Sequence, residues 1–296
     1  MATWEGKTRG GLLGYKIFVF TINYFGLFPA YFLLRFVAFY FFLFARKSNQ
    51  YIYRYFRKRL GYGRFRSFRS VYSNYYIFGQ ILIDKVAALS GLANKFTYNF
   101  DGEEYLREMK EGGLLISAHI GNWEIAGNLL KRLEQPFNIV MFDEEHSQIK
   151  DYLESVLREK KVKVIVIQDD LSHLIEIKNA LENKELIAIH GDRFLPGTKT
   201  IEADFLGAGA PFPEGPYYLA MRFKAPVSFV FAMKETRSHY HFFATRAKIY
   251  EVPANNRINQ AHLEPILKDY LVEFERILLK YPVQWFNYYD FWGSDK

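Results

Sequence analysis

A histidine and a glutamate five residues apart, His119 and Glu124, are the side chains of this sequence best suited to move a proton. They lie in the stretch 114–127, LLISAHIGNWEIAG, where an apolar run typical of a buried strand precedes His119 and an apolar helical pattern follows. A neutral imidazole titrates near neutral pH, so a histidine at a strand end can take a proton from a hydroxyl. If the turn brings Glu124 onto one ring nitrogen, its carboxylate fixes the tautomer and raises the basicity of the other nitrogen.

The same spacing also allows a purely structural role for the two residues. Asn122 is a good N-cap for the helix that follows. Glu124 then falls in the first helical turn, where the helix dipole favours a carboxylate. On this interpretation Glu124 is a capping acid and His119 is a hydrogen-bonded loop histidine, and the spacing alone does not decide between the two.

The pattern of the rest of the chain predicts the elements that would position this pair. A helix is expected over residues 71–95, and strand-like runs then alternate with helix-like runs. This alternation indicates an α/β fold with a mostly parallel central sheet flanked by helices. The strand-like runs are 114–118, 137–142, 162–168, 185–190 and 226–233, with a further strand at 239–246 expected at one edge of the sheet. The helix-like runs are 122–133, 147–160, 171–183, 216–223 and 262–281.

Polar residues follow four of the predicted strands. They occupy positions 119–124, 142–146, 168–170 and 190–193. In open α/β sheets, ligands bind beyond the carboxyl ends of the strands. One such cluster is commonly a solvated loop or a helix cap, but four at the same edge of a parallel sheet predict a site.

The first 70 residues differ in composition from the remainder. They hold 22 of the 55 aromatic residues and 13 Lys/Arg against a single acid, whereas the other 226 residues carry 26 Lys/Arg against 31 acids. Residues 17–34 contain no charge, which is close to the minimum length of a membrane span, and the apolar run resumes over 36–45. We expect an N-terminal membrane-embedded helical segment over residues 1–70 and one α/β domain over 71–296.

A strongly basic segment follows the apolar run. Residues 46–69 hold nine Lys/Arg and no acid, interleaved with Tyr and Phe. Such a segment suits the anionic surface of a membrane. Nucleic acid would attract the same charge but would not explain the neighbouring apolar residues, so we expect a membrane partner and no nucleic acid.

Several other chemistries lack their residues. The chain has no cysteine, which excludes disulfides and thiolate chemistry. It has neither a G-x-S-x-G nucleophile motif nor a Gly-rich phosphate loop. His239 and His241 have strand spacing and could share a metal ion, but no third ligand stands near them in the sequence. We expect neither a metal nor a cofactor.

Three stretches resemble one known family. AHIGNWE at 118–124 resembles the H-x4-D/E motif of membrane-bound acyltransferases, in the form typical of the lipid A biosynthesis (late, or secondary) acyltransferases. GDRFLPG at 191–197 is similar to the family's Asp-centred block after a strand. FLGAGAPFPEGPYYLAMRFKAPV at 205–227 resembles its F-x-G block with the Gly-Pro run that follows. The resemblance covers nearly the whole chain and favours the catalytic interpretation of His119 and Glu124.

The resemblance implies a function and a location. A fatty acyl group would pass from an acyl carrier protein or coenzyme A thioester to a hydroxyl of an amphipathic glycolipid, on the cytoplasmic face of the bacterial inner membrane. His119 would be the general base and Glu124 its orienter. The residues assigned to substrate binding are Asn122, Asp192, Arg193 and Gly215. Asp192 and Arg193 would organise the site or hold a phosphate of the acceptor or of phosphopantetheine, unless they form only a local ion pair.

One departure from the family pattern bears on the acceptor. Relatives usually carry an arginine after the second strand, whereas this chain has VMFDEEHSQIK at 140–150. The acceptor could therefore be another amphiphile, such as an aminolipid, a phospholipid or a pigment polyene. The alternative from another class is a non-catalytic membrane lipid-binding or scaffold protein.

An acyltransferase of this kind also needs a groove for the acyl chain. We expect it beside His119, lined in part by residues 205–212. The aromatic tail at 284–292, QWFNYYDFW, could cover such a channel or pack as part of the core.

Overall fold

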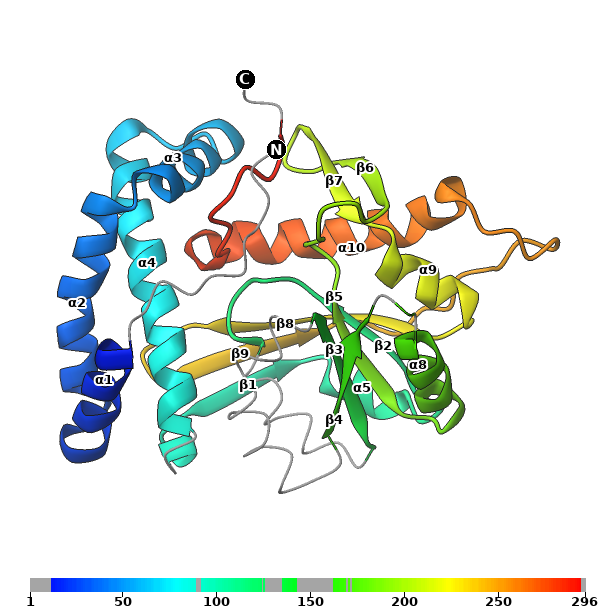
Figure 1. The fold of residues 1–296 in the computed structure, drawn as a ribbon, viewed down its shortest axis with the longest axis horizontal. Helices are drawn as coiled ribbons and strands as arrows, with labels where there is room; N and C mark the ends of the chain where they lie inside the picture. Colours follow the sequence, from blue (N-terminus) through cyan, green and yellow to red (C-terminus); the bar gives the residue numbers. More distant parts are fainter. Residues whose placement is uncertain are drawn as a thin grey trace.

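The computed structural model describes residues 12–88, 92–123, 125, 135–142, 162–168, 170 and 172–293. Figure 1 shows a layer of N-terminal helices standing at one end of a twisted sheet, with further helices over the sheet faces. The predicted helices at 122–133 and 147–160 lie, except for Asn122, Trp123 and Ile125, outside the described residues.

The N-terminal layer begins with two apolar helices. The predicted apolar run is divided into α1 (Leu12–Phe25) and α2 (Leu27–Phe44). The break falls at Gly26, whose φ of 84° lies in the left-handed region that glycine adopts without a Cβ penalty. Among the described helices, α2 is the one long and apolar enough to cross a membrane by length and composition, and most of its residues are not buried.

A basic segment and a long helix complete this layer. They are α3 (Arg46–Arg54), the π-helical η1 (Tyr55–Arg59) and α4 (Arg64–Ala87). Helix α4 packs against α2 on one side and reaches the body on the other, where the Asn74 side-chain amide donates to the carbonyls of Val283 (3.0 Å) and Trp285 (2.9 Å). The division proposed between residues 70 and 71 falls inside α4. The division of the chain into two parts stays a prediction.

The body is built on a seven-stranded sheet, and its mostly parallel α/β architecture confirms the predicted fold class. The strand order is β1-β9-β8-β2-β5-β3-β4. The strands are β1 (Thr97–Asp101), β2 (Gly113–Ser117), β3 (Phe137–Phe142), β4 (Val162–Ile167), β5 (Leu186–His190), β8 (Val227–Lys234) and β9 (His239–Ala244). All neighbouring pairs are parallel except β8 and β9.

The position of β9 corrects one expectation. The strand predicted at the sheet edge pairs on both sides, with β8 and with β1, so β1 forms that edge. The sequence of β1, TYNFD, alternates exposed and half-buried residues and carries no apolar run. A short edge strand with polar side chains is common because it discourages further pairing, but it leaves little sequence signal.

The remaining elements cover the sheet. They are α5 (Glu103–Glu108), α8 (Ser172–Glu182), the hairpin β6 (Thr200–Asp204) and β7 (Gly209–Pro213), α9 (Gly215–Arg222) and α10 (Gln260–Lys280). In Figure 1 the hairpin, α9 and α10 lie on the same side of the sheet. The buried residues of α10 recur at helical spacing, from Leu263 through Tyr270 to Leu278, so one stripe of the helix faces the core.

Aromatic rings fill the core beside α10. Phe205 and Phe212 are fully buried. The Phe205 ring lies 5.1 Å from the Phe274 ring and 5.7 Å from the Trp285 ring, and the Phe212 ring lies 5.5 Å from that of Phe291. The side chains of these two phenylalanines belong to the packed core, as do Trp285 and Phe291 of the aromatic tail. The acyl groove expected beside His119 and residues 205–212 stays a prediction.

A buried ion pair joins the N-terminal layer to the sheet. Lys234 of β8 pairs with Asp84 of α4, and both side chains are almost completely buried. The hydroxyls of Tyr31 and Tyr240 also donate to the Asp84 carboxylate. Burial raises the pKa of Asp84 and lowers that of Lys234, and the opposite charge of each partner opposes its shift. Helices α2 and α4 and strands β8 and β9 therefore meet at one polar centre inside apolar surroundings.

Breaking this pair from one side should destabilise the protein strongly. Lys234→Met leaves the Asp84 carboxylate buried without its cation, which should cost about 3–5 kcal/mol of unfolding free energy. Replacing both partners, as Asp84→Asn with Lys234→Met, should recover most of that loss because no unpaired charge remains. Denaturant unfolding in detergent measures both variants.

Lys248→Met is the matched control. It breaks the Lys248–Asp269 pair, whose side chains are 58% and 39% exposed, and should cost less than about 1 kcal/mol. If Lys234→Met cost no more than this control, the buried pair would not be a structural anchor.

Candidate active site

The two central strands bring His119 and Asp192 together. Strands β2 and β5 are parallel neighbours, with Ser117 paired to His190, so the chain leaves both strands at the same edge of the sheet. The backbone N–H of His119 donates to Oδ2 of Asp192 (3.0 Å), and Nδ1 of the ring donates to Oδ1 (2.8 Å). The expected convergence of polar clusters at this edge is confirmed for these two strands.

The other two polar clusters do not join this site in the described part of the chain. Residues 143–146 lie outside the described residues. At the end of β4, which is an edge strand, the carboxylate of Asp170 accepts from the backbone N–H of Ser172 (2.9 Å). The backbone N–H of Gln168 donates to Nδ1 of His173 (3.3 Å). These contacts hold the connection from β4 to α8, which is a structural role.

The Asp192 carboxyl is buried and remains ionised. Burial by itself would raise its pKa, but the His119 ring, the Arg193 guanidinium and His190 outweigh burial and hold the pKa well below its ordinary value. An ionised Asp192 can only accept hydrogen bonds, so Nδ1 of His119 carries the proton. The chemistry of the ring then falls to Nε2.

A tight turn follows His119 and depends on glycine. Gly121 has a φ of 62°, and a Cβ there would stand 2.0 Å from the backbone oxygen of Ala232. The N–H of Gly121 donates to the backbone oxygen of Gln284 (3.0 Å), and the N–H of Asn122 donates to that of Ala232 (2.7 Å). The turn is therefore held against both β8 and the C-terminal segment.

Asn122 caps the helix that follows, as its position predicts. Its Oδ1 accepts from the backbone N–H of Ile125 (3.1 Å), and its Nδ2 donates to the hydroxyl of Tyr240 (3.1 Å). The side chain is 1% exposed, so these contacts position the turn from inside. Through Tyr240, the turn is connected to Asp84 and Lys234. The proposed contact of Asn122 with substrate stays a prediction.

Glu124 lies outside the described residues. Asp192 makes the contact with a ring nitrogen of His119 that the sequence suggested for Glu124. Asp192 therefore contacts the histidine directly. Neither substrate binding nor an ion pair with Arg193 alone would call for this contact. A role for Glu124 beside the same ring stays a prediction.

Arg193 and Gly215 occupy different surroundings. A guanidinium nitrogen of Arg193 donates to the backbone oxygen of Phe286 (2.8 Å), and the N–H of Phe286 donates to the backbone oxygen of His119 (3.4 Å). Arg193 thus helps to hold the C-terminal segment along the site. Gly215 is exposed at the start of α9, where a Cβ would meet open space, and its proposed substrate contact stays a prediction.

Three further side chains lie around His119 and Asp192, and sequence reasoning did not single them out. The His190 ring lies 4.2 Å from the His119 ring and 5.2 Å from the Trp123 ring. The hydroxyl of Tyr217, from α9, donates to the backbone oxygen of Gly191 beside Asp192 (2.9 Å). The position of His190 at a strand end was a usable signal, whereas nothing local in the sequence marks Tyr217.

Two groups of histidines bear on metal binding. His119, His190 and Asp192 each offer one ligand atom, all within 4.8 Å of one another, so the set could hold a metal ion. Both carboxylate oxygens of Asp192, however, already accept hydrogen bonds from His119. Nδ1 of His239 lies 2.7 Å from the Thr97 hydroxyl, and Nδ1 of His241 lies 3.1 Å from a Glu235 carboxylate oxygen. Hydrogen bonds therefore engage the rings of His119, His239 and His241.

Comparisons with known proteins identify the family. No curated protein sequence matches the chain. Among solved structures, the crystal structure of the 1-acyl-sn-glycerophosphate acyltransferase from Thermotoga maritima is similar, with 13% sequence identity and a TM-score of 0.41 over 78% of this chain and 95% of that chain. The profile of the family described as bacterial lipid A biosynthesis acyltransferase matches residues 66–286, from α4 to the segment that contacts His119. The chain therefore belongs to the bacterial lipid A biosynthesis acyltransferase family and is an acyltransferase.

Proposed function

We propose that this acyltransferase moves a fatty acyl group from an acyl carrier protein or coenzyme A thioester to a hydroxyl of a glycolipid that resembles a lipid A precursor. The observation that carries the proposal is the contact between His119 and the buried, ionised Asp192. A carboxylate that fixes one ring nitrogen leaves the other with defined chemistry, which a protein that only binds lipid would not need. Family membership supports a glycolipid that resembles a lipid A precursor as the acceptor.

His119 acts as the general base in this reaction. Nε2 takes the proton of the acceptor hydroxyl while the oxygen attacks the thioester carbonyl. A new C–O bond forms and the C–S bond breaks, and the imidazolium returns the proton to the departing thiolate. Asp192 stabilises the imidazolium in between. Glu124 is proposed as a second carboxylate that orients the ring.

The acid-rich stretch 142–146, where relatives usually carry an arginine, would suit a less anionic headgroup than that of a lipid A precursor. An aminolipid, a phospholipid or a pigment polyene is therefore the alternative acceptor, with the same chemistry at His119. Mass spectrometry of lipids from cells with and without the protein would identify the acylated product.

We further propose that the N-terminal helices lie in the inner membrane with the α/β body on the cytoplasmic side. One face of α2 packs on α4 through Tyr31 and Leu34, while Phe28, Phe32 and Phe36 on the same helix are exposed. Phe65 and Phe68, in the first turns of α4, are also exposed. An apolar face of this kind supports embedding in lipid, with the basic residues of α3 and η1 at the headgroup layer.

Membrane attachment should have an electrostatic component, which salt weakens, and an apolar component, which salt leaves in place. Binding to vesicles should be stronger with anionic than with neutral lipids, and this difference should shrink at about 1 M salt because the Debye length falls to about 3 Å. Apolar insertion should persist at that salt concentration. Co-sedimentation with vesicles measures both components, and recovery of the full-length protein in a soluble fraction at low salt without detergent would contradict the proposal.

Removal of the proposed base should abolish most turnover without unfolding the protein. His119→Ala should lower turnover by roughly 10²–10⁴-fold, the usual contribution of general-base catalysis. His239→Ala on β9 is the control, since this histidine lies outside the site and should keep wild-type turnover. Purified variants are assayed with an acyl thioester and a lipid extract. Wild-type turnover in His119→Ala would favour the scaffold alternative.

Glu124→Gln separates the two roles considered for Glu124 in the same assay. The substitution keeps the shape of the side chain and its place in the first helical turn but removes the charge. Strong impairment supports the proposed second carboxylate, whereas near-normal turnover supports a capping role alone.

The lowered pKa of Asp192 should appear in the pH dependence of stability. Because the folded pKa lies below the unfolded value of about 3.9, the ionised carboxyl stabilises the fold above about pH 4, and this contribution is lost as the pH falls toward the folded pKa. Asp192→Asn has no carboxyl at this position and therefore lacks this pH-dependent stabilisation. The gap in unfolding free energy between wild type and Asp192→Asn should therefore be present at about pH 5 and shrink below about pH 4, and a gap that widened in acid would contradict the assigned direction.

A further inference from the structure

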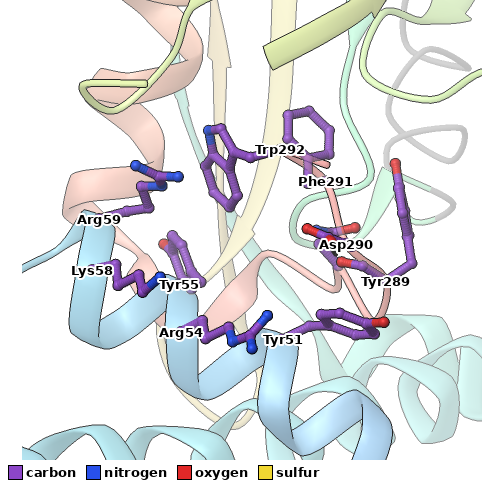
Figure 2. Close-up of a pocket in the computed structure, with 10 residues that line it drawn as sticks. Tyr51, Arg54, Tyr55, Lys58, Arg59, Tyr289, Asp290, Phe291 and Trp292 are labelled. Atoms are coloured by element: carbon purple, nitrogen blue, oxygen red, sulfur yellow. Dashed lines mark hydrogen bonds between the residues drawn. The ribbon is translucent and has the colours of Figure 1, made fainter. Parts of the chain in front are cut away.

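A hollow lies between the basic helix and the C-terminal segment, away from the face of α2 that is proposed to meet lipid. Figure 2 shows its two walls. One wall is α3 with η1 and includes Arg54, Lys58 and Arg59; the other is the tail, from Asn287 to Trp292. The tail that forms this second wall also contacts His119, through the backbone of Phe286.

The hollow is electropositive and has aromatic walls. Three cations and one acid, Asp290, line it, which leaves a formal charge of +2. The spacing of Arg54, Lys58 and Arg59, with a π-helical turn between them, puts their side chains on the helix face that looks toward the tail, as Figure 2 shows. The guanidinium of Arg59 stacks over the Trp292 ring at 4.6 Å, which fixes one side of the hollow.

The hollow is close to the reacting histidine. Phe286 contacts the backbone of His119, and Asp290 follows four residues later, so at most about 14 Å of extended chain separates them. Tyr289 lines the hollow. Burial raises the pKa of its hydroxyl, the charge of Arg193 lowers that pKa, and the charge of Asp192 raises it. A group bound in the hollow is therefore separated from the site by little more than the tail.

We propose that this hollow binds a phosphate group of one of the two substrates while the reacting end of the same molecule reaches His119. The proposal rests on the proposed function and deepens it. Arginine and lysine are the side chains that bind phosphate most strongly, through charge-assisted hydrogen bonds. Tyr51 adds a polar tip on an apolar ring, which suits an amphipathic ligand.

Two phosphates have this chemistry. One is the phosphodiester of the phosphopantetheine arm, which acyl carrier protein and coenzyme A share. The other is a phosphate on the sugar of a glycolipid acceptor. Both belong to molecules long enough to reach from the hollow to His119, so kinetics with each substrate varied in turn must distinguish them.

The double variant Arg54→Gln/Lys58→Gln tests the proposal in the full-length, detergent-solubilised protein. The KM for the substrate that carries the phosphate should rise about 10-fold or more, with kcat little changed, because charge-assisted hydrogen bonds to the phosphate are lost away from the reacting atoms. A rise for the thioester alone identifies the phosphopantetheine phosphate, and a rise for the lipid alone identifies the acceptor phosphate. Unchanged KM values for both substrates overturn the proposal.

The matched control is Arg46→Gln/Lys47→Gln. Both residues are exposed on the same helix α3, outside the hollow, and the variant loses the same charge. Any loss of general attraction to the membrane should be shared by the two double variants. Equal KM increases in both would show that the hollow binds no phosphate and would overturn the proposal.

A binding measurement separates failure of the hollow from failure of the proposed function. Inorganic phosphate and phosphopantetheine should each raise the unfolding temperature of the wild type more than that of Arg54→Gln/Lys58→Gln. If the wild type showed this difference without acyl transfer, the hollow would stand and the proposed reaction would fall. If acyl transfer occurred but neither this difference nor a KM change appeared, the hollow would fall and the reaction would stand.

Discussion

The buried Asp84–Lys234 ion pair is the interaction on which the relative placement of the two parts of this protein depends. A charge removed from water is tolerated only when a partner and further hydrogen bonds compensate for the lost solvation. The pair obtains these from Tyr31 on α2 and Tyr240 on β9, so the helices and the sheet can meet in few arrangements. An apolar contact between α4 and β8 would leave more freedom to slide.

The same polar centre supports the turn that carries the histidine. Tyr240 contacts both Asp84 and the side chain of Asn122, which caps the helix after the turn. The placement of His119 is therefore connected to helices that we propose to lie in the membrane. On the proposed function, this connection would link the position of the membrane helices to that of the turn that carries the base.

Two buried aspartates behave differently because their surroundings differ. Burial dominates at Asp84 and raises its pKa, whereas the cationic and imidazole neighbours of Asp192 outweigh burial and lower its pKa. Asp84 is thus a structural acid and Asp192 an acceptor that fixes the tautomer of His119. The C-terminal segment then contacts the turn through Gln284 and Phe286 and continues as one wall of the basic hollow, so the site and the hollow share one element.

The sequence by itself determined the features that depend on local pattern. The strand at 137–142 has the predicted bounds, and the apolar runs of β2, β5 and β8 were found within one or two residues because buried parallel strands are continuously apolar. The cap contact of Asn122 and the choice of His119 as the candidate base follow from residue types and spacing over a few residues. The break between α1 and α2 falls at Gly26, a residue type that readily interrupts an apolar helix.

Only the tertiary structure decided which distant residues meet. Asp192 lies 73 positions after His119 and reaches it because β2 and β5 are neighbours in the sheet, an order that periodicity does not encode. The Asp84–Lys234 pair, 150 positions apart, and the hollow between η1 and the tail have the same origin. Edge strand β1 was missed for a related reason: burial is set by what packs against a segment, and a segment's own sequence shows only that it is able to be buried.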